Sequence, residues 1–353
     1  MTSVTGDVTS AGGISGTGTV FAINHNADNA LITLRYTLKD ADIQLAEEPF
    51  ESGGAKFSRG TFIIRGVSST DLDKATRELG LQTRALESVP SVKMHPARTA
   101  RIAILHQWTS TQTEGWWRQA FDLYKIPYDY IDPQTIRNTT DLRAKYDVII
   151  FGPGGGQAAV EGTPTWLNPI PYRNSTDTPN VGTWAQTEDT RIGMGLEGLM
   201  HLREFIKAGG VFLGSDTSAE FAIANSFGYG VTVNRPGTGS RVVGSLLRTK
   251  IVDEASPIVY GVADNLAVYS DSGESFSVSA NVGGGGRAGA PAGGGGGGGG
   301  RGGGPVGPRR VAERLTTRTS FREDRLRRGR TCRRCHHQSR CSLGSMPCRR
   351  KSS

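Results

Sequence analysis

The chain has 353 residues and a formal net charge of +8, which arises from 41 lysine and arginine residues against 33 aspartate and glutamate residues. This charge is unevenly spread, because residues 287–353 hold 17 basic and 3 acidic side chains (+14), whereas residues 1–286 hold 24 and 30 (−6). No stretch approaches the roughly 20 apolar residues of a membrane helix and no basic-then-apolar leader opens the chain, so we expect neither membrane association nor a signal peptide.

The first part of the chain predicts a small α/β domain between two irregular segments. Residues 1–18 are rich in Gly, Ser and Thr, which is typical of a flexible segment, and residues 89–98 contain two prolines and no periodicity, which is typical of a linker. Residues 19–88 follow the order β-α-β-β-α-β of a split-βαβ sandwich. The predicted strands are 19–23, 42–47, 60–65 and 81–87, and the predicted helices are 27–38 and 71–79.

Turn and cap residues support these elements. Asn26 or Asp28 is the expected cap of the first helix, and Ser69 or Thr70 that of the second. Gly80 stands where a left-handed residue should end the second helix. Gly53 and Gly54 predict a turn between the second and third strands.

Residues 99–282 predict a second α/β domain. Short, continuous apolar runs indicate buried parallel strands, and helices at 3.6-residue periodicity separate them, so we expect a doubly wound parallel sheet. The predicted strands are 102–105, 128–131, 148–151 and 211–213, and the predicted helices are 114–125, 141–146, 195–208 and 218–227. Three later apolar segments, 231–233, 246–252 and 266–269, are expected to close this sheet as antiparallel edge strands. Residues 154–190 form a long, proline-rich insertion.

Candidate ligand-binding residues follow two of the predicted strands. In doubly wound sheets ligands bind beyond the carboxyl ends of strands, and His106 and Trp108 follow the first strand there, with Glu114 and Trp117 close behind in the sequence. The aromatic residues suit either packing or ligand stacking. Gly154 and Gly155 follow the third strand and could approach a phosphate, although the run is not G-x-G-x-x-G.

The turn from Gly214 to Ser218 resembles the strand-turn-helix elbow that holds the nucleophile of α/β hydrolases and glutamine amidotransferases. The nucleophile position holds Asp216 instead of Cys or Ser. A carboxylate can act as a nucleophile, with Glu220 or His106 assisting. The alternative is structural: Asp216 caps the helix expected to begin at Ser218.

Two metal-like patterns are interpreted as coincidences. His201 and Glu204 match H-x-x-E, but they lie within a predicted helix beside apolar residues. The C-x-x-C-H pattern from Cys332 to His336 lies in the tail, away from residues that could pack around a metal or haem. We therefore expect no metal and no cofactor in this chain.

The tail, residues 283–353, is a glycine tract followed by arginine-rich sequence that contains all four cysteines, and we expect it to be disordered. Its composition is what a reading-frame slip in GC-rich DNA would produce, and we hypothesise that it is such a product. Its arginines could attract nucleic acid by charge alone, but if the tail is an artefact that binding is accidental, so we do not expect a nucleic-acid partner.

Several blocks together resemble the C-terminal part of large bacterial zinc carboxypeptidase-like proteins, the carboxypeptidase A type of metallopeptidase. These blocks are RIAILHQWTSTQTEGWWRQAFDLYKIPYDYID, DLRAKYDVIIFGPGG, IGMGLEGLMHLREFIKAGGVFLGSDTSAEFAI and AEEPFESGGAKFSRGTFII. The resemblance covers residues 17–282 and implies a flavodoxin-like, class I glutamine amidotransferase-like domain. It also implies an upstream peptidase domain that holds the catalytic zinc, and an exported parent protein.

No catalytic residue of that family is carried over to this chain. The resemblance therefore implies a non-catalytic accessory portion, inactive alone, with the upstream peptidase domain as its partner. Two alternatives remain open. One is a stand-alone module that binds a glycan or a peptide, and the other is an amidotransferase-like or hydrolase-like enzyme that uses Asp216.

Overall fold

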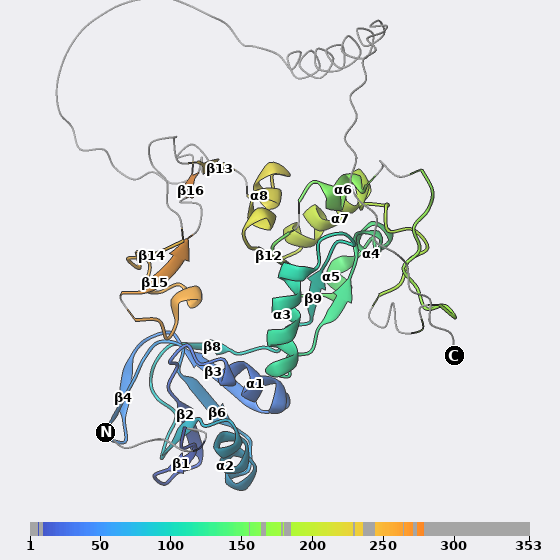
Figure 1. The fold of residues 1–353 in the computed structure, drawn as a ribbon. Helices are drawn as coiled ribbons and strands as arrows, with labels where there is room; N and C mark the ends of the chain where they lie inside the picture. The colour runs from blue at the N-terminus through green and yellow to red at the C-terminus, as the bar shows by residue number, and fades with distance from the viewer. Residues whose placement is uncertain are drawn as a thin grey trace, which may run out of the picture. The chain divides into compact units, whose positions relative to one another are not determined.

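The computed structural model describes residues 10–154, 156–163, 167–177, 185–228, 230–235, 244–263, 265–270 and 274–278, together with Gly6 and Pro179. The tail 283–353, with its C-x-x-C-H pattern, lies outside the described residues, and so does Gly155. The chain is an α/β protein with two main sheets (Figure 1). Among the described residues, no helix is both long and apolar enough to cross a membrane.

The first domain is the predicted split-βαβ sandwich. Its four central strands pair antiparallel in the order β7-β2-β6-β3. Helices α1 and α2 bury Leu31, Leu34 and Leu72 against Phe21, Ile43 and Ile64 of one sheet face. The bounds are β2 Val20–Ile23, α1 Ala30–Thr37, β3 Asp42–Ala46, β6 Phe62–Arg65, α2 Ser69–Glu78 and β7 Gln82–Leu86.

A hairpin that was not predicted from the sequence covers the other face of this sheet. Strands β4 (Phe50–Ser52) and β5 (Ala55–Phe57) pair antiparallel across the two-residue turn Gly53-Gly54. Both glycines have positive φ, as a tight hairpin turn requires. The rings of Phe50 and Phe57 stack with centroids 4.7 Å apart, and Phe57 packs with Ile63 and Leu86 in a second core.

Two predicted irregular segments contribute edge strands, so those predictions were partly wrong. Strand β1 (Gly13–Ser15) lies in the segment 1–18 and pairs parallel to β7. Strand β8 (Met94–Pro96) lies in the predicted linker 89–98 and pairs antiparallel to β3. Such short strands cannot show a periodic apolar pattern, which is why their composition indicated loops.

The helix caps also differ from expectation by one residue. The N-cap of α2 is Ser68, whose hydroxyl accepts a hydrogen bond from the Asp71 backbone N–H, in place of Ser69 or Thr70. Asn29 occupies the N-cap of α1 without a side-chain cap bond, although the Asp28 carboxylate accepts from the Ala30 N–H at 2.9 Å. Gly80 has the expected positive φ, +68°.

The second domain contains a four-stranded, fully parallel sheet in the order β10-β9-β11-β12, which confirms the predicted doubly wound fold. Helices α4 to α8 pack on one face around a core that includes Leu105, Phe151 and Phe205, and α3 lies on the opposite face (Figure 1). The bounds are β9 Ile102–Leu105, α3 Gln112–Leu123, β10 Asp129–Ile131, α4 Pro133–Asn138, α5 Leu142–Lys145, β11 Val148–Phe151, α6 Ala158–Glu161, α7 Gly195–Lys207, β12 Val211–Gly214 and α8 Thr217–Ala224.

The later apolar segments do not close this sheet, which corrects the prediction. Strand β13 (Val231–Asn234) pairs with β16 (Ser275–Val278), and β14 (Ser245–Arg248) pairs with β15 (Ala267–Ser270), in two separate antiparallel ladders. A single 3₁₀ turn, η1 (Pro257–Val259), lies between β14 and β15 in the chain. Strand β12 therefore stays at the sheet edge, and Val211 on it is 53% exposed.

Candidate functional site

The carboxyl ends of the four parallel strands meet at one edge of the sheet, and most of the predicted site residues gather there. His106 and Gln107 follow β9, Asp132 follows β10, Gly152 follows β11 and Ser215 follows β12. His106, Gln107 and Asp132 are buried. Buried polar groups usually have a partner, and ligands of such sheets bind at the carboxyl ends of the strands, so this edge is the candidate functional site.

Asp216 occupies a strained elbow between β12 and α8. Its backbone has φ +53° and ψ −128°. Residues other than glycine rarely adopt such a conformation, which clusters at functional sites. A Cβ on Gly214 would lie 2.6 Å from the Ser218 carbonyl oxygen, so the tight turn requires glycine there.

The Asp216 side chain makes no capping bond to α8. Asp216 thus occupies the N-cap position of α8, as the structural alternative expects, but without a side-chain bond, and α8 begins at Thr217 instead of Ser218.

The loop after β11 lies against this elbow. The Gly154 N–H donates a hydrogen bond to Thr217 Oγ1 at 3.0 Å, and Ser218 Oγ donates to the Gly152 carbonyl. Gln107 Nε2 donates to the Gly154 carbonyl from the neighbouring strand end. The first backbone N–H groups of a helix have no partner within the helix, and the Thr217 N–H is the first such donor of α8, one residue after Asp216. Such donors suit a negative charge that develops during a reaction.

A second group of side chains surrounds Tyr130, which the sequence did not single out. The His106 ring stacks on Tyr130 at 4.0 Å between centroids and meets the edge of Trp108 at 4.8 Å. The Tyr130 hydroxyl donates to Glu114 Oε1. Trp117 approaches the backbone of Gly152, where a Cβ would lie 3.4 Å from its ring. The structure thus brings the predicted residues His106, Trp108 and Glu114 together.

Burial sets the electrostatics of this second group. His106 is 2% exposed. Burial lowers its pKa to about 4, so its ring is neutral near pH 7. Burial likewise raises the pKa of Glu114 and of Tyr130, against the opposing effect of the Arg118 guanidinium 4.3 Å from the Tyr130 ring. Neither ring nitrogen of His106 has a hydrogen-bond partner within the described part of the chain.

The described part of the insertion is tied to this second group through Gln134 on α4. Trp108 Nε1 donates to Gln134 Oε1 at 2.9 Å, and Gln134 Nε2 donates to the Asp189 carbonyl at 3.0 Å. The Tyr172 ring lies 5.4 Å from the Trp108 ring. The insertion also contains Trp166 and Trp184, which lie outside the described residues.

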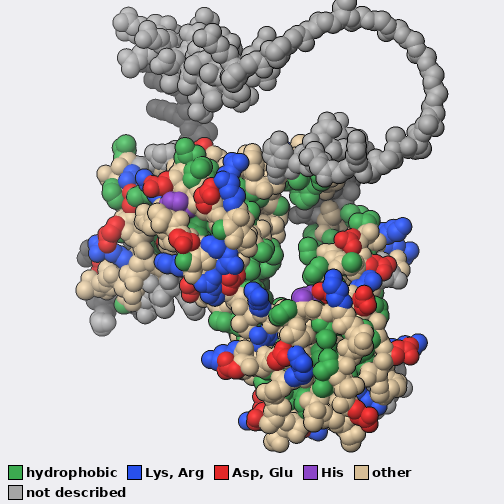
Figure 2. All heavy atoms as spheres, turned by 180° about the vertical axis from the view of Figure 1, so that it is seen from behind, with side chains coloured by type: hydrophobic (Ala, Val, Ile, Leu, Met, Phe, Trp, Pro, Cys, Tyr) green, Lys and Arg blue, Asp and Glu red, His purple; other side chains and the backbone are tan. Residues whose placement is uncertain are grey.

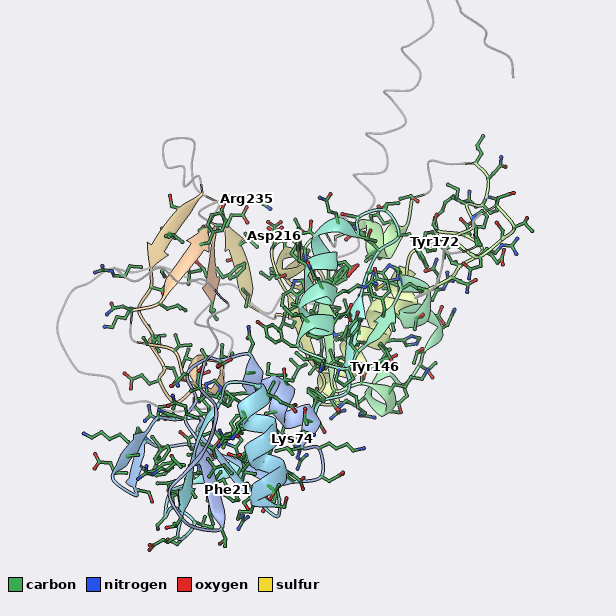
Figure 3. The ribbon with its side chains drawn as sticks, turned by 60° about the horizontal axis from the view of Figure 1, so that its bottom comes forward. Phe21, Lys74, Tyr146, Tyr172, Asp216 and Arg235 are labelled. Atoms are coloured by element: carbon green, nitrogen blue, oxygen red, sulfur yellow. The ribbon has the colours of Figure 1, made fainter. Side chains whose placement is uncertain are left out.

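The predicted site therefore divides into two parts. Tyr172 and Asp216 lie at opposite ends of this domain in Figure 3. The predicted assistant Glu220 pairs with Arg235, while His106 is buried among aromatic rings. Four cavities of about 720, 470, 440 and 340 Å³ are lined by described residues, and Asp216 lines none of these four.

The H-x-x-E pattern lies within a helix, α7, as predicted. His201 Nδ1 contacts the Ile136 carbonyl at 3.1 Å, and Glu204 pairs with Lys207 one turn along the helix. No group of three His, Cys, Asp or Glu side chains suited to a metal ion occurs among the residues that the structure describes.

Comparison with known proteins gives one distant likeness. No family profile matches this chain, and no curated protein matches it. A solved structure of a glutamine amidotransferase from Thermotoga maritima matches at 16% sequence identity and a TM-score of 0.31. The match covers 51% of this chain and 64% of that one, less than two thirds of its length. None of these comparisons supports the expected carboxypeptidase-like family, which stays a prediction.

Proposed function

We propose that this domain is a hydrolase-like enzyme, built on an amidotransferase-like fold, in which Asp216 is the nucleophile. The observation that carries the proposal is the strained backbone at Asp216, φ +53° and ψ −128°, in a strand-turn-helix elbow. Elbows of this kind present a nucleophile at the end of a sheet. The close approach of Gly214 to Ser218, and the Gly154 N–H beside Thr217, support the same role.

A carboxylate at the elbow favours a different electrophile from the one that Cys or Ser attacks. Attack of Asp216 on an amide would form an anhydride, which is a high-energy product. Attack on a saturated carbon, a glycosyl carbon or a phosphoryl group forms an ester or acyl phosphate, as carboxylate nucleophiles do in glycosidases and ATPases. We therefore propose an alkyl, glycosyl or phosphoryl substrate, with the Thr217 N–H beside the reacting oxygen.

The test uses phenyl glycidyl ether, an epoxide that traps reactive carboxylates. An Asp216 oxygen attacks the terminal epoxide carbon, the C–O bond of the ring breaks, and the resulting alkoxide takes a proton from water to leave a hydroxy ester. We expect Asp216 to be esterified at least tenfold faster than the exposed Glu87, by peptide mapping in a mass spectrometer. Asp216→Asn should lose the fast reaction, while Glu87→Gln should keep it. Equal rates at Asp216 and Glu87 would refute the nucleophile.

A second candidate is supported by the contact between Trp108 and Tyr172, which is 43% exposed. Aromatic rings of this kind offer a flat apolar face and a polar edge, so we propose a glycan or peptide ligand there. Titration with an N-acetylglucosamine tetramer or with tetra-alanine should then change the tryptophan fluorescence, and Trp108→Phe should remove most of the change. A signal that Trp108→Phe leaves intact would exclude this site. The predicted accessory role beside an upstream zinc peptidase domain stays a proposal for the parent protein.

A further inference from the structure

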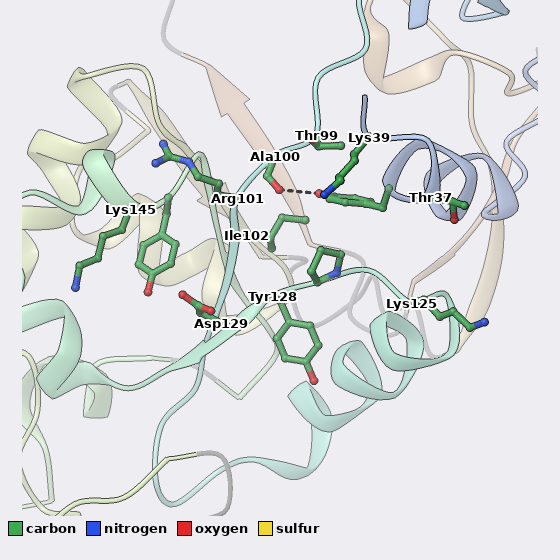
Figure 4. Close-up of a pocket in the computed structure, with 13 residues that line it drawn as sticks. Thr37, Lys39, Thr99, Ala100, Arg101, Ile102, Lys125, Tyr128, Asp129 and Lys145 are labelled. Atoms are coloured by element: carbon green, nitrogen blue, oxygen red, sulfur yellow. Dashed lines mark hydrogen bonds between the residues drawn. The ribbon is translucent and has the colours of Figure 1, made fainter. Parts of the chain in front are cut away.

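A cavity of about 720 Å³ lies at the amino ends of β9 and β10, opposite the edge described above (Figure 4). We call it the amino-edge pocket; its lining includes Tyr36, Lys39, Ile102, Lys125, Tyr128 and Lys145. Its volume falls within the range of about 300 to 1,000 Å³ that small-molecule sites occupy. None of its lining residues belongs to either part of the candidate functional site.

The walls of this pocket come from both domains and are held together by hydrogen bonds. The Tyr36 hydroxyl of α1 donates to the Ala100 carbonyl at 2.7 Å, the bond drawn in Figure 4. Thr33 Oγ1 of the same helix donates to the Tyr124 carbonyl at 2.8 Å, just after α3. Both domains belong to the same compact unit, residues 1–286. The two walls of the pocket are therefore joined by direct hydrogen bonds.

Three lysines line the pocket, and each lies at or just after the end of a helix: Lys39 after α1, Lys125 after α3 and Lys145 in α5. A cation at this position often serves only to balance the negative end of the helix dipole. That explanation requires the last carbonyl groups of the helix to lack a partner. The hydrogen bonds of these carbonyl groups therefore show whether the lysines are needed there.

Several carbonyl groups at these helix ends already have partners. Arg35 Nη1 donates to the Leu38 carbonyl at 2.8 Å after α1. Arg143 Nη1 donates to the Tyr146 carbonyl at 3.0 Å after α5, where Arg101 also binds. At α3 the backbone closes the helix, with the Ile126 N–H bonded to the Phe121 carbonyl at 2.9 Å.

The lysines are therefore surplus positive charge. Within the described residues, no hydrogen bond or ion pair engages the ammonium group of Lys39, Lys125 or Lys145. The only acidic side chain among the lining residues is Asp129, while Arg101 is paired with Asp147 at 3.0 Å. The three lysines belong to residues 1–286, whose net charge is −6. Acidic and basic side chains are interspersed on the face shown in Figure 2.

Apolar and aromatic side chains line the pocket together with the three lysines. The lining includes Ile102, Pro127 and the rings of Tyr36 and Tyr128. The ammonium groups of Lys125 and Lys145 extend toward opposite sides in Figure 4. A ligand that fits must therefore combine a flat apolar body with negative charge at its ends.

We propose that the amino-edge pocket binds a small amphipathic anion, a flat ring system that carries phosphate groups, as in a nucleoside diphosphate. The ring lies against Tyr36 and Tyr128, and the phosphates take the ammonium groups of Lys39 and Lys145. This site is separate from Asp216 and does not depend on the proposed nucleophile.

The test is calorimetric titration of the full chain with ADP, adenosine and inorganic pyrophosphate. ADP should bind at least tenfold tighter than either part alone. Lys39→Ala and Lys145→Ala should each weaken ADP binding about tenfold, the effect of losing one charge-assisted hydrogen bond. Lys74→Ala, on the exposed side of α2 (Figure 3), should leave binding unchanged.

Lys125→Gly separates binding from folding. Lys125 has φ +54°. Glycine adopts this left-handed conformation without strain. The variant should therefore melt no lower than the parent protein. It should bind ADP more weakly, because it removes one of the three lysine charges that line the pocket. No heat at millimolar ADP would overturn the proposal. So would equal affinity for adenosine and ADP, or equal weakening by Lys74→Ala.

Discussion

The protein is expected to lose stability as the pH falls from 6.5 to 4, and replacing His106 with phenylalanine should make that loss about 3 kcal/mol smaller. The pKa of His106 is 6.5 in the unfolded chain and about 4 in the native protein. Between these values the unfolded state binds a proton that the native state excludes, so stability is fully present above pH 6.5 and falls as the pH drops toward 4. Phenylalanine cannot bind that proton.

Other groups contribute in the same pH range, so the comparison must be between variants. Burial also lowers the pKa of His25, which adds stability loss of the same sign. Burial raises the pKa of Glu114, whose protonation in the native state acts in the opposite direction. Near His106, the Asp132 carboxylate favours protonation of the ring and the Arg118 guanidinium opposes it. Subtracting the two pH profiles isolates the imidazole.

The measurement is urea unfolding of both proteins at half-unit steps from pH 4 to pH 8. Phenylalanine keeps a ring against Tyr130 and Trp108 and buries no unpartnered nitrogen. The variant should therefore be at least as stable as the parent at pH 7. Parallel pH profiles for the two proteins would show that His106 is protonated equally in both states.

The second large effect is expected at Gly162, where alanine should cost about 3 to 5 kcal/mol of the free energy of unfolding. The residue has φ +73° and ψ −159°, which only glycine adopts readily. A Cβ there would overlap the Arg191 carbonyl and lie 2.7 Å from the Gly193 nitrogen. The clash falls at the base of the insertion, where the Thr163 N–H donates to the same Arg191 carbonyl at 2.9 Å.

Gly54→Ala is the matched control for this experiment. Gly54 has nearly the same φ, +72°, but nothing lies within 4 Å of a Cβ built on it. Alanine there should cost only the left-handed backbone strain, about 1 kcal/mol. Urea unfolding of both variants at pH 7 measures the difference, and a Gly162→Ala cost no larger than that of Gly54→Ala would contradict the assigned backbone clash.

The strands that could be predicted are those whose two faces are both buried. Ile102–Leu105 and Val148–Phe151 are continuous apolar runs, because helices cover both sides of the parallel sheet. The strands β1 and β8 could not be predicted, since strands this short carry no periodic signal. Their place also depends on partners far away in the chain, such as Gln82 for Gly13 and Gln44 for Pro96.

In the candidate site, too, residues close in the sequence could be predicted, and residues brought together only by the fold could not. The elbow could be found because Gly214, Asp216 and Ser218 stand in one short stretch. Tyr130 could not, because its contact with His106 follows from the register that sets Tyr130 beside Ile104 on the neighbouring strand. Gln134 is recognisable only once α4 exists, and a six-residue helix that begins with proline gives little signal.

The two three-residue strands at the edges of the first sheet limit how readily this protein can pair with other chains. A long, flat border would offer a row of free amide and carbonyl groups to any extended chain nearby. Here β1 and β8 cover β7 and β3, the longer strands of five residues each, and present only three residues outward. The two segments whose composition indicated loops thus shorten the open sheet edges along which another extended chain could pair.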